Sequence, residues 1–205
     1  MDNLLTLGSL FDGSGGFPLG AVFSGILPLW ASEVEPFAIR VTTKRLPWMR
    51  HLGDIHGING AEIEPVDIIT FGSPCTDMSV AGKRAGLEGK QSVLFYEAIR
   101  IIREMRSATH GKYPRFIIFE NVPGAFSSNT GADYHAVLNA IVQTAEPEAE
   151  VPAPDKKGWP TADVLLGNRW SMAYRTVDSQ HFGVAQRRRR IYLVADFGSE
   201  CAGEI

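Results

Sequence analysis

The chain is poor in cysteine and has no long apolar run, and each shortage excludes a class of protein. Its 205 residues include two cysteines, Cys75 and Cys201, too few and too far apart for a disulfide framework or a cysteine-rich metal site. No apolar run approaches the roughly 18 residues of a membrane-spanning helix. The N-terminus lacks the basic and apolar regions of a signal peptide. We therefore expect a metal-free cytoplasmic protein with no membrane segment.

Positive charge is also in short supply. Twenty basic residues face 23 acidic ones, which gives a net charge of −3. Proteins that bind nucleic acid usually present a basic surface to the phosphates. Three interpretations remain open: the chain does not bind nucleic acid, its basic surface is local, or that surface lies in another part of the protein. The length and the hydrophobic content of 44% are typical of one globular catalytic domain.

Apolar runs that predict strands alternate with patterns that predict helices. This alternation predicts an α/β fold with a doubly wound, mostly parallel sheet of the Rossmann-like type, ending in an antiparallel strand pair. A Pro-, Glu- and Lys-rich stretch at about 146–160 indicates an exposed linker or insertion. The predicted strands are 4–11, 26–31, 51–55, 66–71, 115–119, 170–177 and 190–197, and the predicted helices are 17–24, 36–45, 133–144 and one that follows residue 92.

Unusual residues gather where the predicted strands end. A glycine-rich turn, 12–16, follows the first strand, and acidic residues follow the second and third. A long glycine-rich segment, 72–91, follows the fourth strand, and Glu120 and Asn121 follow the fifth. Ligands of such sheets bind beyond the carboxyl ends of the strands. We therefore expect one site at this edge.

The glycine turn indicates a nucleoside-type cofactor. Glycines after a first strand let a ligand approach the backbone at a helix N-terminus, and an acid about 20 residues later can hold ribose hydroxyls. Glu33 and Glu35 both fit that spacing from Gly13. Pro18 stands where a dinucleotide fingerprint has its third glycine, which favours S-adenosylmethionine over NAD. Asp54 is placed to accept from an adenine amino group.

Four motifs then resemble the DNA cytosine-5 methyltransferase family. Phe-Gly-Ser-Pro-Cys-Thr-Asp-Met-Ser at 71–79 is similar to its catalytic-loop motif, and Phe-Glu-Asn-Val at 119–122 to its second catalytic motif. The run from Gln186 to Arg190 resembles its Gln-Arg-x-Arg-Arg motif, and 10–16 its cofactor loop. The motifs come in the family's order and cover most of the chain.

The resemblance implies a role for each matched residue. Cys75 would attack C6 of a cytosine flipped out of double-stranded DNA, and Glu120 would contact N3 and the exocyclic amine. Arg190 would pair with the O2 edge, while Arg188 would brace the loop or the phosphates. S-adenosylmethionine would be held by residues of the cofactor loop and of the later strand ends. These cofactor residues are Phe11, Asp12, Gly13, Gly15, Gly16, Glu33, Val34, Asp54, Ile55, Pro74 and Leu94.

Family members normally continue into a target-recognition domain and a final cofactor motif, and neither is found before Ile205. We therefore expect this chain to be truncated and to be weakly active or inactive alone. Three alternatives stay open: an RNA cytosine-5 methyltransferase, a non-catalytic or split methyltransferase subunit, and a nicotinamide-dependent oxidoreductase. Retention of both Cys75 and Glu120 argues against a non-catalytic role, and Pro18 argues against the nicotinamide alternative.

Overall fold

The computed structural model describes residues 4–72, 92–198 and 202. The chain forms two compact units. The first comprises Met1–Gly72 and Tyr96–Ile117, and the second Ser73–Phe95 and Ile118–Ile205. No helix in the described ranges has the length and hydropathy needed to cross a membrane.

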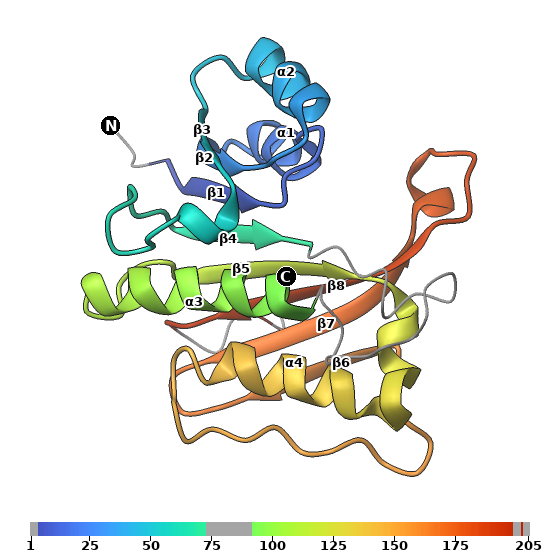
Figure 1. The fold of residues 1–205 in the computed structure, drawn as a ribbon. Coiled ribbons are helices and arrows are strands. Elements are labelled where there is room, and N and C mark those ends of the chain that lie inside the picture. Colours follow the sequence, from blue (N-terminus) through green and yellow to red (C-terminus); the bar gives the residue numbers. More distant parts are fainter. Residues whose placement is uncertain (1–3, 73–91, 199–201, 203–205) are drawn as a thin grey trace. The chain divides into compact units, whose positions relative to one another are not determined.

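The first unit is built on parallel strands in the order β3-β2-β1-β4 (Figure 1). Trp30 fills the space above Gly8, where an added Cβ would lie 2.2 Å from the indole ring. This close approach explains why the first strand has a glycine at its centre. The elements are β1 Thr6–Leu10, α1 Gly16–Phe23, β2 Leu27–Ser32, α2 Pro36–Arg45, β3 Arg50–Gly53, the 3₁₀ turn η1 Ile55–Gly57 and β4 Ile68–Phe71.

Two elements pass from one unit to the other. Helix α3, Ser92–Ala108, begins in the second unit and lies in the first from Tyr96 onward. Strand β5, Phe116–Asn121, begins in the first unit and ends in the second. Its inward side chains, among them Ile117 and Phe119, are fully buried.

The second unit has the strand order β5-β8-β7-β6, with β6, β7 and β8 antiparallel. Helix α4, Ala132–Val142, packs on one face of these strands through Tyr134, whose ring centroid lies 5.4 Å from that of Tyr174. A 3₁₀ segment, η3 Pro123–Gly131, adds Phe126 to the same aromatic group. The remaining elements are β6 Ala162–Leu166, β7 Ser171–Asp178, η4 Ser179–Phe182 and β8 Arg189–Asp196.

The predicted α/β class, with a mostly parallel sheet and a C-terminal antiparallel strand pair, is confirmed, and the predicted pair is β7 and β8. The structure adds one antiparallel strand that was not predicted, because β6 pairs with the outer edge of β7. Four of the five β6 side chains are exposed, so the strand lacks the alternation of buried and exposed residues that reveals a strand in sequence.

The segment at about 146–160 has no helix or strand, and most of its residues are exposed. It is nevertheless fixed to α4. The backbone N–H of Val151 donates to Asn139 at 2.7 Å, and the indole of Trp159 donates to the Gly131 carbonyl at 2.9 Å. The segment therefore follows the surface of the second unit and is not a free linker.

Candidate active site

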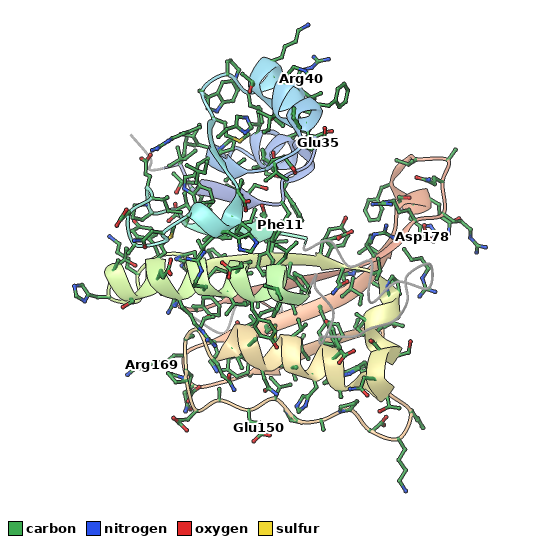
Figure 2. The ribbon with its side chains drawn as sticks, viewed as in Figure 1. Phe11, Glu35, Arg40, Glu150, Arg169 and Asp178 are labelled. Carbon is green, nitrogen blue, oxygen red and sulfur yellow. The ribbon has the colours of Figure 1, made fainter. Side chains whose placement is uncertain are left out.

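The turn after β1 is held in an unusual backbone conformation. Phe11, Gly13 and Gly15 have positive φ angles of 55°, 57° and 86°. Such a φ costs a non-glycine residue such as Phe11 about 1–3 kcal/mol, and residues of this kind concentrate at functional sites. Figure 2 labels Phe11, which directly follows the end of β1.

The glycines of the turn leave space for a ligand. A Cβ added at Gly13 or Gly16 would meet none of the described atoms within 4 Å, whereas at Gly15 it would lie 2.7 Å from the Thr42 methyl group. Gly15 is therefore required by packing as well as by φ. Gly16 is the first residue of α1 and Gly13 lies in the turn before it, and both present open backbone. Backbone N–H groups at a helix N-terminus favour a carboxylate or another anion.

Glu33 ties the end of β2 to this turn. One oxygen of its carboxylate accepts from the Gly13 N–H at 2.7 Å, and the other accepts from the N–H groups of Val34 and Glu35 at 2.7 and 2.9 Å. The spacing of 20 residues noted in the sequence thus corresponds to a direct contact. Of the two acids that fit this spacing, Glu33 is the one that touches the turn. Glu35 instead caps α2 through the N–H of Phe37.

Asp12 supports the turn from inside. Its carboxylate is buried, accepts from the Ser9 hydroxyl at 2.8 Å, and has a second oxygen without a partner among the described residues. Burial raises the pKa of Asp12 to about 6, the bond from Ser9 opposes the rise, and the charge of Glu33 adds to it. This placement favours support of the turn over direct contact between the side chain and a cofactor.

The raised pKa gives a test of this buried carboxyl. Between the ordinary value of 3.8 and about 6, the folded state binds the Asp12 proton more tightly than the unfolded chain. Its contribution to the free energy of unfolding therefore falls as pH rises through this window, by up to about 3 kcal/mol. We expect Asp12→Asn to remove this slope, which urea denaturation of both proteins from about pH 4 to 7 would measure. Parallel pH profiles for the two proteins would contradict it.

The remaining residues assigned to the cofactor lie in different surroundings. Val34 is exposed, and Asp54 is exposed and caps η1 by accepting from the His56 N–H at 3.0 Å. The Ile55 side chain is buried in the core, so any contact with a ligand would come from its backbone. Leu94 is half-buried on the part of α3 that belongs to the second unit.

Sequence reasoning missed Arg100 as a support for this region. Its guanidinium donates to the carbonyls of Ile58 and Ile55 at 2.9 and 3.2 Å, and it pairs with Glu97 and Glu104 at 2.7 and 2.9 Å. It therefore fixes the segment that follows Asp54. The sequence did contain a signal for these ion pairs, because Glu97 and Glu104 stand three residues before and four residues after Arg100 on the predicted helix.

Thr42 and His51 form a second unpredicted support in the first unit. The Thr42 hydroxyl lies 3.0 Å from Nε2 of His51, and Nδ1 of His51 is buried without a partner among the described residues. Burial lowers the pKa of His51, while the charge of Glu33 opposes this. No sequence pattern pointed to this pair.

The second unit brings together two catalytic candidates that are 70 positions apart. Nε of Arg190 on β8 lies 2.8 Å from the Glu120 carboxylate on β5, and both side chains are mostly buried, with exposures of 21% and 23%. Burial raises the pKa of Glu120, and the charges of Arg190 and Arg188 oppose the rise. The site therefore holds a carboxyl group that takes up a proton more readily than a free glutamate does.

Arg188 and Asn121 flank this pair. The Arg188 backbone N–H donates to Asp178 at 3.0 Å, and its exposed guanidinium acts electrostatically on Glu120. Asn121 is buried, its carbonyl oxygen accepts from the Val122 N–H, and its amide nitrogen has no partner among the described residues. Glu120 and Asn121 are the last two residues of β5, whereas the sequence predicted that this strand ends at residue 119.

The sequence of the chain matches the model of a known protein family. A model of the C-5 cytosine-specific DNA methylase family matches residues 5–147, well over half of the chain. The chain belongs to this family of DNA methylases. The nicotinamide-dependent alternative therefore loses its support.

Several curated methylases are similar to the chain. A protein of Escherichia phage P1 named DNA N-6-adenine-methyltransferase is 33% identical over 83% of this chain and 26% of its own length. The type II methyltransferases M2.BsuMI of Bacillus subtilis and M.NgoBI of Neisseria gonorrhoeae are 32% and 28% identical over 91% and 90% of the chain. The chain covers 41% and 48% of these two proteins, so it spans between a quarter and a half of the length of these three relatives.

Solved structures show the same fold. A prophage-encoded protein of Escherichia coli, described as a DNA modification methyltransferase, superposes with a TM-score of 0.64 at 20% identity, over 94% of this chain and 47% of its own. The Dnmt2 methyltransferase of Schizosaccharomyces pombe gives 0.63 at 15% identity, over 96% and 52%. At these identities the likeness establishes the methylase fold alone.

Two residues of the predicted methylase site lie outside the described residues. They are Pro74 and Cys75, which follow β4 in the sequence. The described part of the methylase has no group of three or more side chains that could hold a metal ion.

Proposed function

We propose that this chain is the catalytic part of an S-adenosylmethionine-dependent DNA methyltransferase that acts on C5 of cytosine. The observation that carries this proposal is the ion pair between Glu120 and Arg190 at 2.8 Å. A carboxyl group and a guanidinium side by side match the hydrogen-bonding groups along the Watson–Crick edge of cytosine. The carboxyl suits N3 and the exocyclic amine, and the guanidinium suits O2.

The pair supplies what cytosine needs before it can be methylated. C5 is a weak nucleophile until a thiolate adds at C6, and that addition places negative charge on the ring. A protonated Glu120 would donate to N3 and neutralise this charge, and the raised pKa of Glu120 supports such a role. Arg190 would hold the ring by its O2 atom and Cys75 would supply the thiolate, which departs when the C5 proton is removed.

The first unit supplies residues suited to a methyl donor. S-adenosylmethionine provides an electrophilic methyl group when bound. Its amino-acid part would meet the open backbone at Gly13 and Gly16, and its ribose would meet Glu33. The exposed side chain of Val34 would cover the adenine, and Asp54 would accept from the adenine amine.

The product distinguishes this proposal from its alternatives. The chain is incubated with duplex DNA and S-adenosylmethionine carrying a deuterated methyl group, and the nucleosides are analysed by mass spectrometry. We expect label in 5-methylcytosine. Label in N6-methyladenine, as the name of the phage P1 relative suggests for that protein, or preferential labelling of competing RNA would overturn the proposal. The assay counts product per protein molecule, so that even a low turnover is measured.

A further inference from the structure

Strands β7 and β8, joined by η4, form a hairpin in the second unit (Figure 1). Side chains of this hairpin line a groove. It encloses about 330 Å³, at the lower end of the range of roughly 300–1,000 Å³ for small-molecule sites. The position of the groove follows from the strand register. Val177 pairs with Arg190, and the side chains of Arg190 and Tyr192 lie on the same face of β8 because they are two residues apart. The lining residues are Val177, Ser179, Phe182, Arg188, Arg190 and Tyr192.

The groove combines aromatic faces with cations. Phe182 is 70% exposed and Tyr192 37% exposed, so both rings have surface available to a ligand. Arg188 and Arg190 line the same space. Aromatic rings beside guanidinium groups are the means by which proteins hold an unstacked base together with its phosphate.

The charge of the hairpin favours a phosphate group. Four consecutive arginines, residues 187–190, stand near two carboxylates, those of Asp178 and Glu120, although the chain as a whole is acidic. Asp178, labelled in Figure 2, is occupied by the N–H groups of Gln180 and Arg188 and by the Gln180 amide. Within the described ranges, the guanidinium groups of Arg187, Arg188 and Arg189 have no carboxylate within 4 Å. These arginines support the interpretation that the chain has a local basic surface.

Arg190 connects the groove to the catalytic pair. It lines the groove and also binds Glu120 at 2.8 Å. Tyr192 interacts electrostatically with the same carboxylate. Burial raises the pKa of the Tyr192 hydroxyl, and the charge of Glu120 raises it further. The groove therefore adjoins the place where the proposed function puts the target cytosine.

We propose that this groove binds the nucleotide adjacent to the target cytosine on the same strand. Its base lies against the rings of Phe182 and Tyr192, and its phosphate lies on Arg188. The proposal rests on the proposed function for the position of the cytosine. Because stacking accepts any base, the groove contributes affinity with little sequence preference.

The test uses the 205-residue chain and a short single-stranded oligonucleotide with one cytosine and a neighbouring 2-aminopurine. A single strand avoids the cost of unstacking a duplex. Affinity is measured by anisotropy, and stacking by the 2-aminopurine fluorescence, with the fluorophore placed on either side of the cytosine. We expect binding with a changed fluorescence from one of the two positions. Phe182→Ala should weaken binding about tenfold or more and abolish the fluorescence change, whereas Phe182→Trp should retain both.

Two further variants sharpen the result. Phe23 on α1 is 82% exposed, so Phe23→Ala is the matched control and should change neither affinity nor fluorescence. Arg188→Gln should weaken binding and lower the slope of log affinity against log salt by about 0.7, the value for one phosphate contact on a single strand. Absence of oligonucleotide binding, or equal behaviour of Phe182→Ala and the parent chain, would overturn the proposal that the groove binds a nucleotide. The exposed aromatic residues would then be assigned to contact with a protein partner. If Phe182-dependent binding occurs without 5-methylcytosine formation, the groove stands and the proposed function fails.

Discussion

Replacing Glu120 by glutamine should lower methyl transfer about 10²- to 10⁴-fold, the usual contribution of a general acid. The amide has the shape of the carboxyl group, but it can neither take up nor release a proton in the relevant pH range. It therefore cannot neutralise the ring when the thiolate adds. Product per protein molecule, measured as labelled 5-methylcytosine, gives the effect directly.

The control for this variant is a second glutamate of the same unit. Glu146 is half-buried and accepts from the Trp170 indole at 2.9 Å, a bond that an amide oxygen can keep. We expect Glu146→Gln to leave methyl transfer unchanged. Glu120→Gln also leaves Arg190 without its partner, so its fold must be checked by thermal unfolding and by titration with S-adenosylhomocysteine. A folded Glu120→Gln protein with undiminished methyl transfer would remove Glu120 from the mechanism.

The pH dependence of adduct formation by the wild-type protein should also report the titration of Glu120. Because burial raises the pKa of Glu120, the protonated form persists to higher pH than in a free glutamate. We therefore expect the rate of adduct formation to fall as pH rises through that pKa, and the Gln variant to lack this step. Arg190 and Arg188 oppose the rise, so substituting either would shift the step upward.

Local sequence signals predicted much of the fold. Apolar runs located every strand except β6, and Pro36 marked the start of α2. The 20-residue spacing between Gly13 and Glu33 predicted a shared ligand site, and the structure shows the two in contact at 2.7 Å. The strand positions, the start of α2 and the proximity of Gly13 to Glu33 could be predicted because each depended on a few neighbouring residues or on one parallel connection.

Features that depend on tertiary contacts escaped prediction. The left-handed conformation of Phe11 could not be predicted, because phenylalanine rarely adopts it. The buried position of Asp12 follows from the packing of the turn, which the sequence does not reveal. Phe182 and Tyr192 are ten positions apart, and they face one groove because β7 turns back as β8. Exposed aromatic residues in a strand and its turn otherwise resemble ordinary surface residues.

Replacing Cys75 by serine should abolish covalent trapping on DNA that contains 5-fluorocytosine. In the proposed reaction the Cys75 thiolate forms a bond to C6, and the electron pair of the ring then attacks the methyl group from C5. Release of the enzyme needs loss of the C5 proton, and fluorine at that position cannot leave as a cation. The complex therefore persists through denaturing electrophoresis. A serine hydroxyl is far less ionised than a thiol and should form no such complex.

The other cysteine makes this experiment decisive. Cys201 is the only other thiol of the chain, so Cys201→Ser should trap as well as the parent protein, and mass spectrometry should locate the adduct on the peptide that contains residue 75. One bond-forming event per molecule is enough for detection, so the result does not depend on the rate of turnover. Trapping by Cys75→Ser, or its loss in Cys201→Ser, would place the nucleophile elsewhere. Glu120→Gln should trap slowly while Cys75→Ser does not trap at all, because the carboxyl group assists the addition and the sulfur performs it.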